Sequence, residues 1–158
     1  MKNNMMKKLL TLVLAGAMTL SLAACGAKDT PSADQPDNST EEAKTYKVAV
    51  IKQLDHASLD EIANAVTAEL DKIAADNGVT IEYEVTSGQG DQTILKQLSD
   101  QAIADGVNAI IPIATTAAQI AALSAEDAKT PVVYAAVSDP ETAKLTGIDY
   151  VTGTSDAL

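Results

Sequence analysis

Short apolar runs alternate along this chain with amphipathic segments of helical period, and this alternation limits its possible folds more than any other feature. The apolar runs, which are rich in valine and isoleucine, are residues 46–51, 79–85, 107–111 and 131–137. Between them, apolar side chains recur at steps of three and four residues, as in residues 59–74. Strands that alternate with helices form parallel βαβ units. The sequence therefore predicts an α/β fold, a three-layer Rossmann-like domain with a mostly parallel sheet and helices on both faces.

Polar residues stand where the predicted helices should begin. The predicted N-terminal caps are Ser58, Asp91, Thr116 and Asp139. Ser58 and Thr116 also have the spacing of a capping box, with Glu61 and Gln119 three residues later. Capping alone would explain each of these residues, and a capping side chain can also contact a ligand.

The first 24 residues have the three-part order of a secretory signal. Lys2, Lys7 and Lys8 precede an apolar run over residues 9–22, and small residues follow. That run is too short to remain as a membrane-spanning helix. The sequence Leu22-Ala23-Ala24-Cys25 resembles the bacterial lipobox, which predicts that Cys25 becomes a lipidated N-terminus on the outer face of the cell membrane. The alternative is an ordinary signal peptide that contains a cysteine.

Residues 25–44 have the composition of a flexible linker, because they carry almost no apolar side chains that could be buried. Residues 45–158 then remain for one folded domain, which is a usual domain size. The formal net charge of −11 makes nucleic acid and anionic lipid head groups unlikely partners. Contact with the membrane is therefore expected through the lipid anchor only.

Four polar loops follow the predicted strands, and in a parallel sheet they should meet at its carboxyl edge. They are residues 53–58, 87–91, 114–116 and 137–140. Free N–H groups at helix starts suit a carboxylate, and Asp139 or Asp55 suits an ammonium group. This combination predicts a binding site for a zwitterion.

The sequence gives little support for catalysis. His56 is the single histidine and Cys25 the single cysteine, so the usual ligand sets for a metal ion are missing. No Gly-x-Ser-x-Gly turn is present, and the glycines around Gln89 do not form a dinucleotide fingerprint. We expect no catalytic residue, no metal and no cofactor, and an exported enzyme is the least favoured function.

Five motifs in this order resemble the substrate-binding lipoproteins of ABC importers, in the tryptophan/tyrosine-type family with the type I periplasmic-binding-protein fold. The motifs are His56-Ala57-Ser58-Leu59-Asp60, Gln89-Gly90-Asp91, residues 113–119, residues 136–140 and Gly153-Thr154-Ser155-Asp156. The family often has proline at the position of Ala57 and threonine at that of Ser138. The likeness covers about residues 46–156.

The resemblance implies a ligand held between two lobes, and a permease and an ATPase as partners. It places His56, Ser58, Thr115, Thr116, Ser138 and Asp139 near the ligand, and Gln89 from the second polar loop completes the predicted set. It suggests an aromatic amino acid, although the chain itself has no Trp or Phe to stack on a ring. A lipid-anchored sensor that presents a solute to a receptor is the alternative function.

The end of the chain is predicted to approach a hinge. Residues 146–151 would form a fifth strand or a crossover, and residues 152–156 would form the hinge. We therefore expect these 158 residues to be the first, N-terminal lobe of a longer protein.

Overall fold

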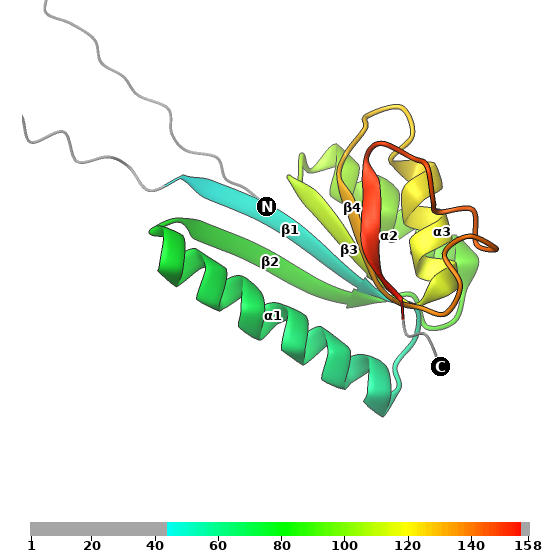
Figure 1. Cartoon of the computed structure of the whole chain (residues 1–158), viewed down its shortest axis with the longest axis horizontal. Coiled ribbons are helices and arrows are strands. Elements are labelled where there is room, and N and C mark those ends of the chain that lie inside the picture. Colours follow the sequence, from blue (N-terminus) through cyan, green and yellow to red (C-terminus); the bar gives the residue numbers. More distant parts are fainter. Residues whose placement is uncertain (1–43, 156–158) are drawn as a thin grey trace, which may run out of the picture. The chain divides into compact units, whose positions relative to one another are not determined.

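Five parallel strands form one sheet in the order β2-β1-β3-β4-β5. The structure, a computed structural model, describes residues 44–155, so the predicted signal peptide, Cys25 and nearly all of the predicted linker lie outside the described residues. The strands are β1 Thr45–Lys52, β2 Thr80–Ser87, β3 Ala109–Ile113, β4 Val132–Val137 and β5 Val151–Ser155. The helices are α1 Ala57–Asn77, α2 Gln92–Ala104 and α3 Thr115–Ser124. Figure 1 shows these elements along the chain.

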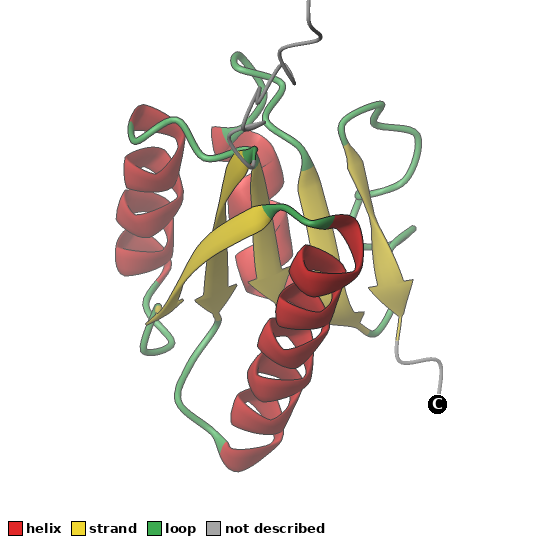
Figure 2. Cartoon of the chain, turned by 90° about the vertical axis from the view of Figure 1, so that its left-hand side faces the viewer, coloured by secondary structure: helices red, strands yellow, loops and turns green. Residues whose placement is uncertain are grey.

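The helices lie on both faces of the sheet, as the sequence predicts (Figure 2). Alternate residues of β1 point to opposite faces, so Val48 and Val50 pack beneath α1 while Ile51 packs beneath α2 and α3. Leu95 of α2 is one of the most deeply buried side chains on the second face. The predicted three-layer Rossmann-like fold is confirmed.

The strand order reverses direction between β1 and β3, because the chain first adds β2 on one side and then β3, β4 and β5 on the other. This is a doubly wound sheet with one topological switch point. Ligands of such sheets bind outside the carboxyl ends of the strands at that point. The loops after β1 and β3 therefore flank the position where a ligand of this fold is expected.

Three of the four predicted helix caps are wrong. The side chain of His56, not Ser58, caps α1, since His56 Nδ1 accepts from Ser58 N–H at 3.3 Å and Ser58 lies within the helix. Thr116 lies within α3, whose N-cap position is Ala114 and has no side-chain hydrogen bond. Asp91 does cap α2, and Asp139 caps a set of turns rather than a helix.

Two predicted strand boundaries are also wrong. β3 starts at Ala109 rather than Val107, because Val107 N–H still bonds to Ala102 O of α2, at 3.2 Å. The last strand is Val151–Ser155, so most of the predicted hinge is strand β5, paired in parallel with β4.

Candidate functional site

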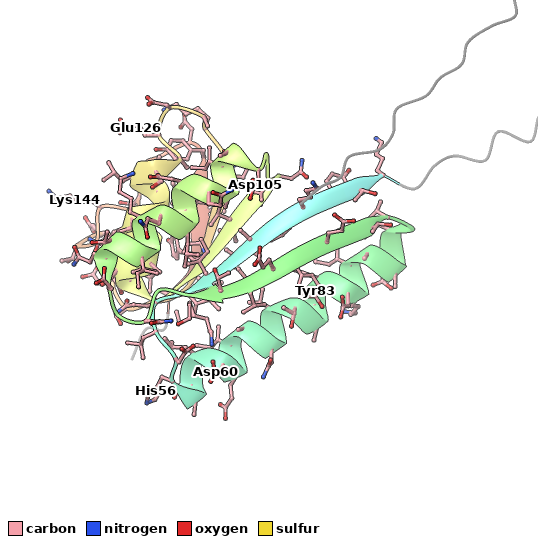
Figure 3. The ribbon with its side chains drawn as sticks, turned by 180° about the vertical axis from the view of Figure 1, so that it is seen from behind. His56, Asp60, Tyr83, Asp105, Glu126 and Lys144 are labelled. Atoms are coloured by element: carbon pink, nitrogen blue, oxygen red, sulfur yellow. The ribbon has the colours of Figure 1, made fainter. Side chains whose placement is uncertain are left out.

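The loops that follow β1, β2, β3 and β4 all lie at the carboxyl edge of the sheet. Every predicted ligand-binding residue is in one of these loops or in the first turn of the helix that follows it. His56 and Ser58 follow β1, Gln89 follows β2, Thr115 and Thr116 follow β3, and Ser138 and Asp139 follow β4. Figure 3 shows His56 and Asp60 at this end of the molecule, with Asp105 at the opposite end. The fold thus brings four separate segments to one edge.

A partly buried lysine organises the loop after β1. Lys52 ends that strand with its side chain only 13% exposed, and its Nζ donates to Asp60 and, at 3.0 Å, to Asp55. The hydrogen bonds that Lys52 donates, first to Asp60 and then to Asp55, raise the pKa of Lys52. Lys52, followed by Ser87, lowers the pKa of Asp55. Asp55 is therefore already paired with a cation, which makes it a poor partner for a ligand ammonium group.

The backbone and side chain of Gln53 connect three of the four loops. Its N–H donates to Ile113 O at 3.1 Å, and its own carbonyl accepts from Gly90 N–H at 2.9 Å. Its side-chain Oε1 accepts from Thr116 N–H at 3.1 Å. Sequence reasoning placed Gln53 in a polar loop but gave it no role, because nothing local shows that its partner is 63 residues away.

The loop after β2 is built around a tight turn. Gln89 is exposed and has a φ of 52°, and its N–H donates to Ser87 Oγ at 3.2 Å. Asp91 then accepts from Thr93 N–H at 2.6 Å and from Ile94 N–H at 3.2 Å. These N–H groups, Ile94 first, hold the pKa of Asp91 below its usual value.

The turn into α3 has an unusual backbone. Ala114 has φ 79° and ψ 162°, a region that residues other than glycine seldom adopt and that costs about 1–3 kcal/mol. Its N–H donates to Ala135 O at 3.0 Å, which fixes the turn to β4. Thr115 and Thr116 follow directly and are partly exposed at the edge. Strained backbone of this kind tends to occur at functional sites.

The end of β4 is irregular as well. Ala136 has φ 55°, and the pairing of β4 with β5 shifts between Tyr134 and Val137. Such a bulge redirects the residues that follow it. The next residues are Ser138 and Asp139, both of which are exposed.

Among residues 44–155, no lysine side chain forms a salt bridge with the negatively charged Asp139. Its carboxylate accepts from Glu141 N–H at 3.1 Å, from Thr142 N–H at 3.0 Å and from Thr142 Oγ1 at 2.6 Å. These neutral donors, Thr142 first, lower the pKa of Asp139 and keep the group ionised. Unlike Asp55, Asp139 can still attract an ammonium group.

Together, these loops present helix-start N–H groups, hydroxyls and the carboxylates of Asp91 and Asp139, neither of which is paired with a cation, at the carboxyl edge of the sheet. Carboxylates bind well at helix N-termini and ammonium groups bind carboxylates, so the edge is suited to a zwitterion. Among residues 44–155, no group of three or more His, Cys, Asp or Glu side chains could hold a metal ion. None of the described helices is long and apolar enough to cross a bilayer.

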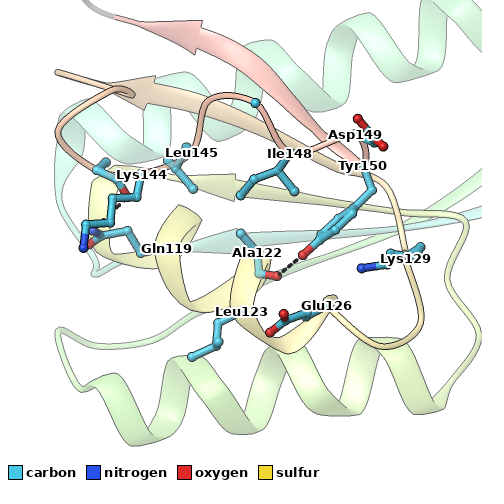
Figure 4. A pocket seen from close by; sticks show the side chains of 12 residues that line it. Gln119, Ala122, Leu123, Glu126, Lys129, Lys144, Leu145, Ile148, Asp149 and Tyr150 are labelled. Carbon is cyan, nitrogen blue, oxygen red and sulfur yellow. Dashed lines mark hydrogen bonds between the residues drawn. The ribbon is translucent and has the colours of Figure 1, made fainter.

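A groove of about 800 Å³ lies elsewhere, between α3 and residues 143–150 (Figure 4). Tyr150 forms one of its walls, with its hydroxyl donating to Ala122 O at 3.2 Å and Lys129 Nζ lying 4.8 Å from the ring centre. None of the seven predicted ligand-binding residues lines this groove. It is separate from the carboxyl edge.

Comparison with known proteins decides the family. The sequence model described as ABC transporter substrate binding protein matches residues 47–158. The chain belongs to this family. The family resemblance that the sequence motifs indicated is therefore confirmed. The family is one of solute-binding proteins rather than enzymes.

Individual members of the family are similar to this chain over its whole folded part. A tyrosine-binding protein from Clostridioides difficile (strain R20291) is 27% identical over 96% of this chain and 45% of its own length. The ABC domain in complex with L-Trp from Streptococcus pneumoniae is 30% identical with a TM-score of 0.61, over 71% of this chain and 39% of that one. An open, ligand-free substrate-binding protein with adhesive properties from Clostridium difficile is 26% identical with a TM-score of 0.64, over 72% of this chain and 39% of that one.

This substrate-binding-family chain spans less than half the length of each of these relatives. Its described residues correspond to one lobe of their fold.

Proposed function

We propose that this chain supplies one wall of the binding site of a solute-binding protein that captures an amino acid for an ABC importer. The proposal rests on one observation: the N-terminal turn of α3 and the carboxylate of Asp139, which no cation neutralises, both lie at the carboxyl edge of the sheet. The first turn of α3 would bind the ligand carboxylate and Asp139 its ammonium group. Thr115, Thr116 and Ser138 would add hydroxyl donors.

Aromatic amino acids are the first ligands to test. The relatives include a tyrosine-binding protein and a structure that contains L-Trp. His56 and Gln89 lie exposed on the two flanking loops, where they could contact a side chain that extends beyond the zwitterion. The described residues include no Trp or Phe, so any Trp or Phe that stacks on the ring would have to come from the opposite lobe.

Closure is the mechanism that this arrangement favours. Small-molecule sites usually bury about 70–90% of a ligand, and an open sheet edge offers only one of the two walls needed. A second lobe would close over the ligand, and the permease would bind the closed form. Cys25, lipidated, would keep the protein at the outer face of the cell membrane, with residues 25–44 as the tether.

Calorimetry on the full-length protein tests the proposal. L-Trp and L-Tyr should bind, and their amides should bind at least about tenfold more weakly, because the amides lack the carboxylate that α3 would hold. N-acetylated L-Trp should also bind weakly, because it lacks the ammonium group. Equal binding of the free amino acid and both blocked forms would exclude the zwitterion site.

A further inference from the structure

The N-terminal turn of α3 is stabilised from a different loop. α3 starts after Ala114, whose methyl side chain cannot accept a hydrogen bond, and no side chain caps the helix from its N-cap position. Yet the N–H of Thr116, one of the first-turn donors that normally need a cap, is bonded to Gln53 Oε1 at 3.1 Å. Gln53 thus serves as the cap from across the switch point of the sheet.

The same residue is fixed on two other sides. Its backbone N–H bonds to Ile113 O at the end of β3, and its carbonyl accepts from Gly90 N–H in the loop after β2. Gln53 is partly buried, and its side-chain amide is held by the bond from Thr116 N–H. Three loops of the candidate site therefore meet at this single residue.

The bond from Thr116 N–H to Gln53 helps to hold the strained turn at Ala114. A positive φ at a residue with a side chain persists only where the surroundings hold it. Two hydrogen bonds hold this turn: Ala114 N–H donates to Ala135 O at 3.0 Å, and Thr116 N–H donates to Gln53 Oε1. Losing the second contact would free one side of the turn and leave the Thr116 N–H without its partner.

We propose that Gln53 is a positioning residue for ligand binding: its side-chain amide sets the orientation of the first turn of α3, and its backbone ties that turn to the loops after β1 and β2. This inference rests on the proposed function, since it assumes that the first turn of α3 contacts the ligand. Gln53 acts through Thr116 and does not itself contact the ligand.

The test uses the full-length protein with L-Trp as the probe ligand. Gln53→Met keeps the length of the side chain and removes the acceptor. It should weaken L-Trp binding about three- to tenfold and should speed hydrogen exchange at the Thr116 amide by a similar factor, as expected for one lost hydrogen bond. Gln53→Asn should do the same, because its shorter side chain cannot reach Thr116. Gln53→Asn also serves if the Met variant fails to fold.

Two further variants separate positioning from general stability. Gln53→Glu retains an acceptor of the same reach, so exchange at Thr116 should stay slow. Gln97→Met makes the same replacement at an exposed position of α2 and should change neither readout. Unchanged L-Trp affinity in both Gln53→Met and Gln53→Asn, or an equal loss in Gln97→Met, would overturn the inference. Absence of amino-acid binding in the unaltered protein would instead reject the proposed function.

Discussion

Carboxylates at the carboxyl edge differ in what surrounds their charge, and this difference decides what each residue can do. Asp55 and Asp60 share the ammonium group of Lys52, so much of their charge is neutralised within the protein. Asp139 and Asp91 accept only from neutral N–H and O–H groups. The sequence places three of these aspartates in polar loops and Asp60 in the first helical segment, but only the three-dimensional contacts distinguish the free charges from the paired ones.

Replacing Asp139 by Asn should separate its two roles. Asparagine caps a turn about as well as aspartate, so thermal unfolding should change little. The loss of charge should weaken L-Trp binding about tenfold or more, on the scale of a charge-assisted hydrogen bond. Asp55→Asn is the matched control, and it should keep the affinity within about threefold. Equal losses in the two variants, measured by calorimetry, would show that Asp139 has no special role.

Asp91 should make the domain sensitive to acid. Its pKa in the folded protein is lowered by the N–H groups of Ile94 and Thr93, whereas an aspartate in an unfolded chain has a pKa of about 3.9. The unfolded state therefore binds more protons in this range, so the stabilisation is present above about pH 4 and is lost as the pH falls through the folded pKa. Melting temperatures measured from pH 6 to pH 2 should fall less steeply for Asp91→Asn. Parallel profiles for the two proteins would contradict this assignment.

At the level of elements, local periodicity predicted the strands and helices whose ends are also fixed locally. β1, β2 and α2 follow the apolar pattern, and α2 begins at its own capping residue Asp91. The start of α3 could not be predicted in this way, because its partner Gln53 comes from another loop. The rule for parallel sheets predicted the position of the candidate site. Gln53 was missed because its partner lies 63 residues away, whereas the partners of Lys52, Asp55 and Asp60, are only three and eight residues away and their pairing depends on how the loop folds.

The last strand shows how packing across strands can override a local pattern. Gly153 resembles a hinge glycine in the sequence, yet it lies in β5 directly opposite Tyr134 of β4. A Cβ atom at this position would stand 2.1 Å from Tyr134 O and 2.5 Å from its ring. The glycine is therefore required to leave room for the backbone oxygen and the ring of Tyr134, not for flexibility.

Gly153→Ala should accordingly destabilise the domain by about 1–3 kcal/mol, the usual cost of forcing an extra atom into a packed site. The clash includes a backbone oxygen, so a change of side-chain rotamer cannot relieve it. Thr152→Ala, at the exposed neighbouring position, should cost no more than about 1 kcal/mol. Urea unfolding of both variants tests this, and an equally stable Gly153→Ala would show that β5 can move away from Tyr134.

At the scale of the whole molecule, the described residues form an α/β lobe with the candidate site at the carboxyl edge of its sheet. This chain matches less than half of the length of each of the relatives described above. Within the lobe, the order of the strands fixes the edge at which a ligand would bind, and a few cross-loop contacts fix the shape of that edge. The proposed ligand site and the predicted lipid anchor therefore lie in separate segments of the chain.

This separation leads to a prediction for the anchor. If Cys25 is the lipidated N-terminus, Cys25→Ser should release the protein from the membrane into the soluble fraction. The variant should keep the melting temperature and ligand affinity of the unaltered protein, because residues 26–43 separate the anchor from β1. Detergent-phase partitioning of the two proteins measures the first effect, and Ser21→Ala, four residues before the cysteine, is a control that should stay anchored. Equal retention of Cys25→Ser would rule out the lipid anchor while leaving the binding site untouched.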